Sequence, residues 1–140
     1  MEKTRIMPED HPWYWTMPVK FSQGWKVEGG TYIWVGGQVS ADRNGQVVAP
    51  GDIEQQTRNV FECIKKVLNE AGADMKDLVK LNTYYVFDGD ESEAIGFWEK
   101  MTRVRMEYLA NPGPAGTAVR VAGLAQPGLL IEVEGVAVIP

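Results

Sequence analysis

Residues that bind metals or form disulfides are scarce in this sequence. Its 140 residues include one cysteine, Cys63, and one histidine, His11. A single cysteine excludes an intrachain disulfide and any metal site built from several cysteines. A single histidine, with no serine–histidine–aspartate pattern around it, offers no catalytic triad. We therefore expect no metal ion and no cofactor.

Long apolar runs are also missing. No stretch approaches the roughly 20 apolar residues that a membrane-spanning helix needs. No apolar segment follows the basic residues Lys3 and Arg5 in the way that a signal peptide requires. The sequence therefore predicts a soluble, cytoplasmic protein that does not enter a membrane.

Positive charge is the third feature in short supply. Lysine and arginine number 14 against 19 aspartates and glutamates, which gives a net charge of −5 at pH 7. Binding to a nucleic acid depends mainly on cationic side chains that contact its phosphates. Because the chain is acidic and has no cluster of lysine and arginine, we expect no nucleic-acid partner.

The residues that are present predict one α+β domain, with two amphipathic helices packed on one sheet. Hydrophobic residues make up 44% of the chain, which is typical of a globular protein with a packed core. Apolar spacing predicts helices over 53–71 and 93–109, and Asp52 and Gly72 are the expected cap residues of the first. Strands are expected over a hairpin, 25–28 with 31–35, and over 38–40, 80–87, 117–121 and 129–139. Gly36 and Gly37 interrupt a strand pattern, which suggests a bulge or a close approach of a ligand to the backbone.

The first 18 residues differ in composition from the rest. They contain three prolines, the only histidine, and the aromatic run Trp13, Tyr14 and Trp15. Prolines oppose a regular helix, and large aromatic side chains gain much by burial. We expect residues 1–18 to form an extended aromatic and proline-rich arm, packed on the domain or on a neighbouring subunit. Residues 19–140 are expected to form the domain itself.

The last third of the chain carries the strongest candidates for chemistry. Residues 129–139 alternate, so that Leu129, Ile131 and Val133 share one face of a strand while Glu132 and Glu134 share the other. A strand carboxylate that is partly buried has a raised pKa and acts as an acid or base near neutral pH. A glutamate that simply faces solvent is the alternative.

Four segments carry a resemblance to a known family: residues 21–23 (FSQ), 35–39 (VGGQV), 114–124 (PAGTAVRVAGL) and 131–137 (IEVEGVA). They resemble, in the same order, the Y-S-Q, v-S-G-Q, P-A-R-x-x-V-x-V-x-x-L and V-E-I-E-A-V-A segments of the YjgF/RidA family. This family comprises the reactive imine and enamine deaminases and is also called the endoribonuclease L-PSP family. With the helix boundaries at 51–57 and 71–73, the resemblance covers nearly the whole chain.

The resemblance implies a chorismate-mutase-like fold, in which two helices pack on one face of a mixed β-sheet. It also implies a homotrimer with a small-molecule ligand in each cleft between subunits. Glu132, rather than Glu134, matches the family glutamate that positions or activates a water. Gly37 matches the glycine of the S-G-Q segment and lies in the implied cleft, and Phe21 stands there in place of the family's tyrosine.

One position departs from the family pattern. Deaminating members carry an arginine that holds the substrate carboxylate, whereas this chain has Gly116, followed by Thr117, and can offer only backbone groups at that point. Arg120, four residues along the same strand, supplies a replacement guanidinium only if the strand bends, and a surface arginine is the alternative reading. Arg103 and Arg105 on the second helix are weaker candidates for that role.

Two functions remain open after this comparison. In the first, Glu132 directs a water onto the C=N carbon of an imine or enamine metabolite, and ammonia leaves. In the second, the homotrimer binds a small metabolite in the same cleft without turning it over, which the glycine at position 116 favours. Whether the protein is an enzyme is therefore open. The family labels endoribonuclease and translation initiation inhibitor are not transferred, because the chain is acidic.

Overall fold

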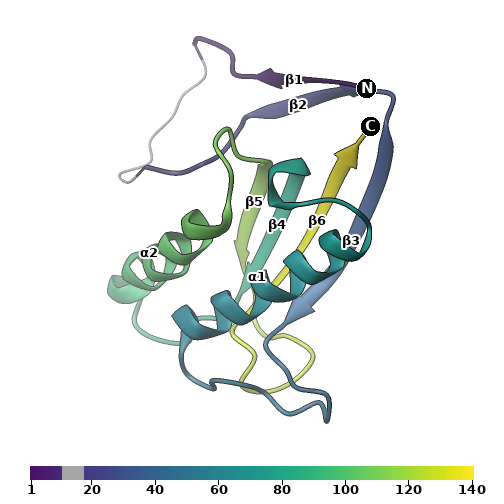
Figure 1. The fold of residues 1–140 in the computed structure, drawn as a ribbon. Coiled ribbons are helices and arrows are strands. Elements are labelled where there is room, and N and C mark those ends of the chain that lie inside the picture. The colour runs from purple at the N-terminus through teal and green to yellow at the C-terminus, as the bar shows by residue number, and fades with distance from the viewer. Residues whose placement is uncertain (11–17) are drawn as a thin grey trace.

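A four-stranded β-sheet organises the domain. The computed structural model describes residues 1–10 and 18–140. Its central strands pair in the order β3-β6-β4-β5 (Figure 1). They comprise β3 (Thr31–Val39), β4 (Leu78–Tyr85), β5 (Ala115–Arg120) and β6 (Ile131–Ile139). The strands β4 and β5 are parallel and β6 is antiparallel to both of its neighbours, so the sheet is mixed.

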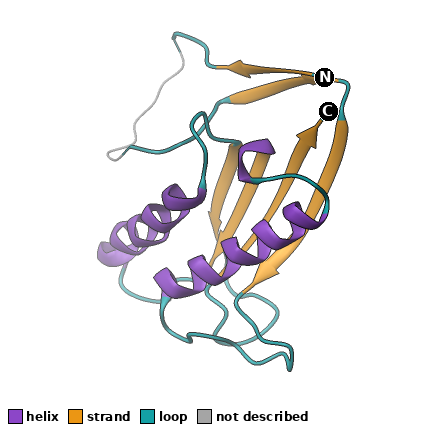
Figure 2. Ribbon diagram, in the orientation of Figure 1, coloured by secondary structure: helices purple, strands orange, loops and turns teal. Residues whose placement is uncertain are grey.

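Two helices, α1 (Ile53–Glu70) and α2 (Glu91–Tyr108), cover one face of this sheet (Figure 2). Asp52 caps α1 by accepting a hydrogen bond from the backbone N–H of Gln55 at 3.0 Å. Gly72 follows the helix with a φ of 77°, a conformation that glycine adopts without strain. Both predicted caps of α1 are therefore confirmed.

Each helix connects two parallel strands of the sheet. The helix α1 and the short 3-10 helix η1 (Met75–Asp77) lie between β3 and β4, and α2 lies between β4 and β5. The predicted fold class is confirmed: two helices pack on one face of a mixed sheet. The observed bounds of both helices and of the last three strands differ from the expected ones by no more than two residues.

The predicted hairpin between residues 25–28 and 31–35 is wrong. The strand β2 (Gly24–Glu28) pairs antiparallel with β1 (Glu2–Ile6) in a separate two-stranded sheet, and β3 pairs with β6. The Gly29–Gly30 turn exists, with φ of 74° and 89°, but it leads from one sheet into the other. The β3 strand carries the buried Val35 and joins the core sheet, whereas β2 has no buried residue.

The strand β3 is also longer than expected. It continues through both glycines to Val39, so residues 38–40 are not a separate strand. The pairing with β6 shifts between Val35 and Gln38, where β3 has one residue more than its partner. The predicted bulge at Gly36 and Gly37 is therefore confirmed.

The expected N-terminal arm falls only partly within the described residues. Its first part forms β1, which lies with β2 beyond the ends of the central strands (Figure 1). Residues 11–17, which include His11 and the three consecutive aromatic residues, lie outside the described residues. The arm over residues 1–18 and its boundary with the domain at residue 19 stay predictions.

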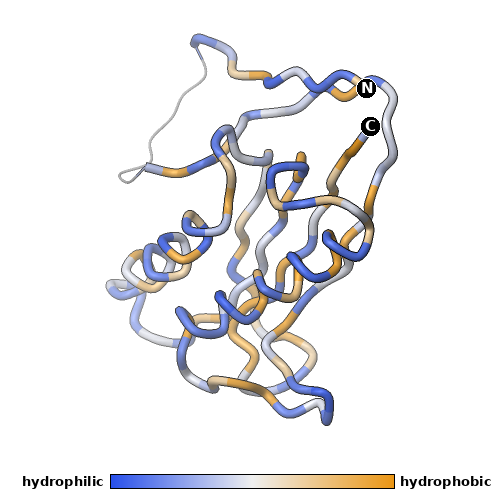
Figure 3. The backbone as a smooth tube through the Cα atoms, in the orientation of Figure 1, coloured by the Kyte–Doolittle hydropathy of each residue, from blue (hydrophilic) through white to orange (hydrophobic). Residues whose placement is uncertain are grey.

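The core fills the space between the helices and the sheet. The largest fully buried apolar side chains include Phe61, Ile64 and Leu68 of α1, Met101 of α2, and Ile131 of β6. Hydrophobic and hydrophilic residues alternate along α1, as expected of a helix with one buried face (Figure 3). None of the helices in residues 1–10 and 18–140 is long and apolar enough to span a membrane.

Candidate functional site

The face of the sheet that the helices leave uncovered carries the two strand glutamates. Leu129, just before β6, and Ile131 and Val133 of β6 are buried as the alternation predicts, and Glu132 and Glu134 are half-buried on the other side. Glu132 lies opposite Tyr84 of β4 and Val39 of β3.

Glu132 occupies space that the bulge of β3 leaves open. A Cβ atom built on Gly37 would fall on the carboxylate oxygen Oε2 of Glu132. Only glycine at position 37 is therefore compatible with this placement of the carboxylate. Among the described residues, Glu132 has no partner in a side-chain hydrogen bond or an ion pair, so its oxygens remain available to a water or a ligand.

Glu134 forms hydrogen bonds with neighbouring side chains. Its Oε1 accepts hydrogen bonds from the Tyr84 hydroxyl at 2.8 Å and from Nδ2 of Asn82 at 3.3 Å. The hydrogen bond to Glu134 raises the pKa of Tyr84 above 10.0, with further contributions from desolvation and from the negative charges of Glu134 and Glu132. The tyrosine therefore stays neutral at physiological pH and acts as a donor.

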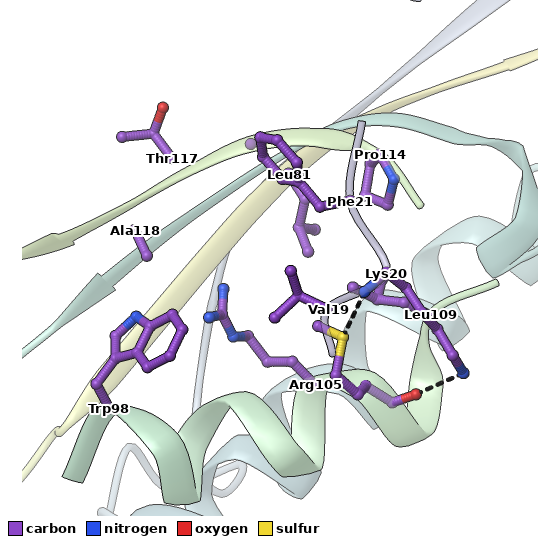
Figure 4. A pocket seen from close by; sticks show the side chains of 12 residues that line it. Val19, Lys20, Phe21, Leu81, Trp98, Arg105, Leu109, Pro114, Thr117 and Ala118 are labelled. Carbon is purple, nitrogen blue, oxygen red and sulfur yellow. Dashed lines mark hydrogen bonds between the residues drawn. The ribbon is translucent and has the colours of Figure 1, made fainter. Parts of the chain in front are cut away.

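A cavity of about 90 Å³ lies on the helix side of the sheet, between α2, β5 and residues 19–21 (Figure 4). Phe21, Gly116 and Thr117, which the sequence placed in the substrate cleft, all line this cavity. Gly116 pairs with Leu81 of β4, and a Cβ atom built on Gly116 would fall on the carbonyl oxygen of Leu81. Position 116 therefore has no room for a side chain unless the two strands separate.

The three candidate arginines lie in different surroundings. Arg120 forms an ion pair with Glu91 at the start of α2, and its guanidinium lies 5.1 Å from the ring centre of Phe87. It does not line the cavity. Arg103 is exposed and pairs with Glu99 one turn away on the same helix.

Arg105 is the arginine that reaches the cavity. Its Nη1 donates to Oγ1 of Thr83 at 3.2 Å, and its Nη2 donates to Oγ1 of Thr102 at 2.7 Å. Its guanidinium also lies 6.0 Å from the ring centre of Trp98. Burial lowers the pKa of Arg105 to about 10, so the group is still charged at neutral pH.

Sequence reasoning ranked Arg105 behind Arg120, although the sequence held a signal for it. Trp98, Met101, Thr102 and Arg105 follow each other at helical spacing, and Met101 and Thr102 are fully buried. An arginine on the apolar stripe of an amphipathic helix points at the sheet rather than at solvent. The stripe therefore indicated a buried guanidinium, but not which strand it would meet.

The candidate residues form two groups within one chain. Glu132 and Gly37 belong to the uncovered face of the sheet, while the cavity lies on the face that carries the helices. The strand β4 separates β6 from β5, so two interstrand spacings, about 9–10 Å, lie between the strands of Glu132 and Gly116. A single chain does not bring the two groups onto one face.

A second hollow, of about 460 Å³, lies on the uncovered face of the sheet. It is lined by Trp34 and Gly36 of β3, by Lys80 and Asn82 of β4, and by Glu134. No cluster of three histidine, cysteine or carboxylate side chains within the described part of the chain could hold a metal ion.

Two helices on one face of a mixed sheet, together with the strand motifs, define a protein of the chorismate-mutase-like class that the sequence resemblance implied. Comparison with known proteins identifies the family within this class. The family model described as endoribonuclease L-PSP matches residues 17–139. The chain belongs to this family, which is also called the YjgF/RidA or Rid family.

Individual relatives agree with that assignment. A RutC family protein of Pyrococcus abyssi is 38% identical over 117 residues, which are 84% of this chain and 84% of the relative. The 3-aminoacrylate deaminase RutC of Acinetobacter baylyi is 38% identical over 105 residues, covering 75% and 77% of the two chains. The crystal structure of YyfB of Yersinia pestis, a Rid family protein of unknown function, superposes with a TM-score of 0.81 at 31% identity. That superposition covers 99% of this chain and 100% of YyfB.

Proposed function

We propose that this Rid-family protein is a hydrolytic deaminase of reactive imine and enamine metabolites. The observation that carries the proposal is the Glu132 carboxylate, which lies in the space beside Gly37 without a side-chain partner among the described residues. Family membership supports the proposal, as does the 38% identity to a protein named 3-aminoacrylate deaminase.

In the proposed reaction, Glu132 accepts a proton from a water as the water oxygen attacks the C=N carbon. The electron pair of the C=N bond moves to nitrogen, which takes up a proton and gives a tetrahedral carbinolamine. As this intermediate collapses, the nitrogen takes the proton that Glu132 received, the C–N bond breaks and ammonia leaves, and the hydroxyl loses its proton to Glu132 or to water, which leaves a carbonyl product. An enamine enters the same route after tautomerising to the imine. The chain contributes one general base, held in position by the strand and the bulge.

The proposed site is completed by a second copy of the chain, within a homotrimer. Glu132 and the cavity beneath β5 lie on opposite faces of the sheet, so a cleft that contains both must combine two chains. On the uncovered face, Trp34 is 75% exposed to solvent, and its ring stacks on that of Tyr32 with the ring centres 6.4 Å apart. Large exposed aromatic side chains of this kind are typical of surfaces that another protein covers. Light scattering that gave the mass of a monomer would contradict this assembly.

Deamination is tested with imines generated from L-amino acids by an amino-acid oxidase, with ammonia release measured with and without the protein. Acceleration is expected from the natural chain and from the matched control Glu134→Gln, and is expected to be lost in Glu132→Gln. Glutamine keeps the shape of the side chain but is a far weaker base, so the comparison isolates proton transfer. Equal rates with Glu132→Gln and the natural chain would overturn the role of Glu132.

The second candidate function is binding of a small metabolite by the same homotrimer without turnover. Gly116 favours it, because the close approach of Leu81 leaves no room there for a side chain that would hold a substrate carboxylate. Under this alternative, the natural chain would bind 2-oxo acids in a calorimetric titration, yet would accelerate ammonia release from none of the imines.

A further inference from the structure

The cavity beneath β5 is positively charged in an acidic protein. Among the described residues, its lining includes Arg105 and Lys20 but no aspartate or glutamate, although the chain as a whole carries a net charge of −5. Within residues 1–10 and 18–140, Arg105 takes part in no ion pair. The cavity thus has an excess of cationic groups on its walls.

The hydrogen bonds of Arg105 are incomplete. A guanidinium has five N–H donors, and two of those of Arg105 are used by the hydroxyls of Thr83 and Thr102. Its Nε is buried and has no hydrogen-bond partner among the residues that the structure describes. A buried polar group without a partner is costly, and a buried charge without a counter-charge is more so. Neutral threonine hydroxyls do not remove that cost.

The surroundings of Arg105 indicate which kind of ligand would satisfy its remaining N–H donors. The side chain extends from α2 into the space between Trp98 and Val19 (Figure 4). The second cation, Lys20, donates from its Nζ to the carbonyl oxygen of Met106 at 2.7 Å, so its ammonium group lies near the end of α2 and away from the guanidinium (Figure 4). The rest of the lining is mainly apolar, with Leu81 and Leu109 among its members.

We infer that Arg105 is the anion-binding residue of this cavity, and that the cavity takes a small monocarboxylate with a short apolar body. A carboxylate matches the planar fork of a guanidinium and satisfies two of its donors at once. A cavity of about 90 Å³ is several times the roughly 10–15 Å³ that one water needs, so it admits a molecule of several heavy atoms. The apolar lining suits an alkyl group and offers little to the additional charge of a phosphate.

In this assignment, the guanidinium that binds the ligand comes from α2 and not from position 116 of β5. Gly116 cannot carry a side chain, and Arg105 reaches the cavity that Gly116 lines from the opposite wall. The ligand is therefore held from α2. The inference concerns binding alone and does not rest on the proposed deaminase, because no turnover enters its test.

The test follows the Nε–H resonance of Arg105 by nitrogen-15 NMR while 2-oxobutanoate is added to the full chain. A shift that saturates is expected for this resonance. Butanone, which has the same chain without the carboxylate, is expected to leave it in place. Inorganic phosphate and sulfate are included as separate titrations, and binding of these as tightly as 2-oxobutanoate would overturn the choice of a carboxylate.

Calorimetry on two matched variants completes the test. Arg105→Met keeps the length of the side chain and removes its charge, so 2-oxobutanoate binding is expected to weaken tenfold or more. Arg103→Met makes the same change at the exposed arginine two residues away and is expected to bind as the natural chain does. If Arg105→Met fails to fold, the Arg105 resonance in the natural chain decides, together with Arg105→Lys, which is expected to weaken binding because it loses the fork. No saturable shift, or equal affinity in Arg105→Met, would overturn the inference.

Discussion

Gln56 offers a sharp test of how the strand that carries Glu132 is held in place. The residue lies on α1, is fully buried, and makes three hydrogen bonds to backbone groups of two separate loops. Its Nε2 donates to the carbonyl oxygens of Ala49 at 3.1 Å and Gly128 at 2.8 Å, and its Oε1 accepts from the N–H of Leu130 at 2.9 Å. Replacement by leucine, which has nearly the same volume, removes all three bonds without opening a large cavity.

The magnitude follows from the number of bonds. Each hydrogen bond contributes about 0.5–1.5 kcal/mol net, and leaving a buried backbone group unpaired costs about 1–3 kcal/mol. Burial of the leucine methyl groups offsets part of this loss. We therefore expect Gln56→Leu to lower the free energy of unfolding by about 3 kcal/mol. With an unfolding entropy of about 2.1 cal/mol/K for each residue, this corresponds to a fall in Tm of about 10 °C.

The assay is thermal unfolding followed by circular dichroism, at one fixed protomer concentration because any oligomer makes Tm depend on concentration. Gln55→Leu is the matched control, since Gln55 is the adjacent exposed residue and its side chain donates a hydrogen bond to Asn59 on the same helix. The control is expected to change Tm by less than about 2 °C, as an exposed helical pair contributes a few tenths of a kcal/mol. Equal shifts for the two variants would refute the argument that Gln56 supports the β6 strand.

Three further predictions concern the site. Gly116→Ala is expected to lower the free energy of unfolding by about 2 kcal/mol, because the added Cβ falls on a carbonyl of the adjacent strand. Denaturant titrations measure this change, and an unchanged midpoint would contradict the prediction. Glu134→Gln is expected to return the pKa of Tyr84 toward 10.0, as followed by carbon-13 NMR of labelled tyrosine. The substitution replaces the carboxylate by a weaker hydrogen-bond acceptor and removes the negative charge of Glu134. Because the pKa of Tyr84 is higher in the folded state, its contribution to stability is complete below about pH 10 and is lost as pH rises through the folded pKa. An unchanged NMR titration of Tyr84 in Glu134→Gln would contradict the prediction. Gly37→Ala is expected to displace Glu132 and to reduce any ammonia release as strongly as Glu132→Gln does, with retention of full activity as the outcome that rejects it.

The sequence predicted most of the fold because its signals are local. Helical spacing, Asp52 and Gly72 located α1 to within one residue, and the alternation in residues 129–139 separated the buried side of β6 from the side with Glu132. These features depend on a few neighbouring residues and on the side chains that they bury.

Strand pairing could not be predicted in the same way. The Gly29–Gly30 turn indicates a reversal of the chain but does not decide which strands pair. The strand β2 pairs with the five-residue strand β1 instead of with β3. The burial of Arg105 also depends on long-range packing, since Thr83 is 22 residues away in the sequence. The helical stripe contained Arg105, but the cavity exists only once β5 has packed beside β4.

The bulge in β3 divides this strand into two segments that are out of phase with each other. Before it, Val35 points to the core while Trp34 points away, and after it Gln38 takes the core-facing position opposite Val133. Deletion of one of the two glycines would restore a single phase, because Val35 and Gln38 would then be two residues apart and both would keep their core-facing positions. A one-residue deletion elsewhere in the strand would instead turn the side chains on one side of the deletion over to the other face of the sheet. A one-residue deletion at the bulge should therefore be better tolerated by the fold than one elsewhere in β3, although it would change the space beside Gly37 that the Glu132 carboxylate occupies.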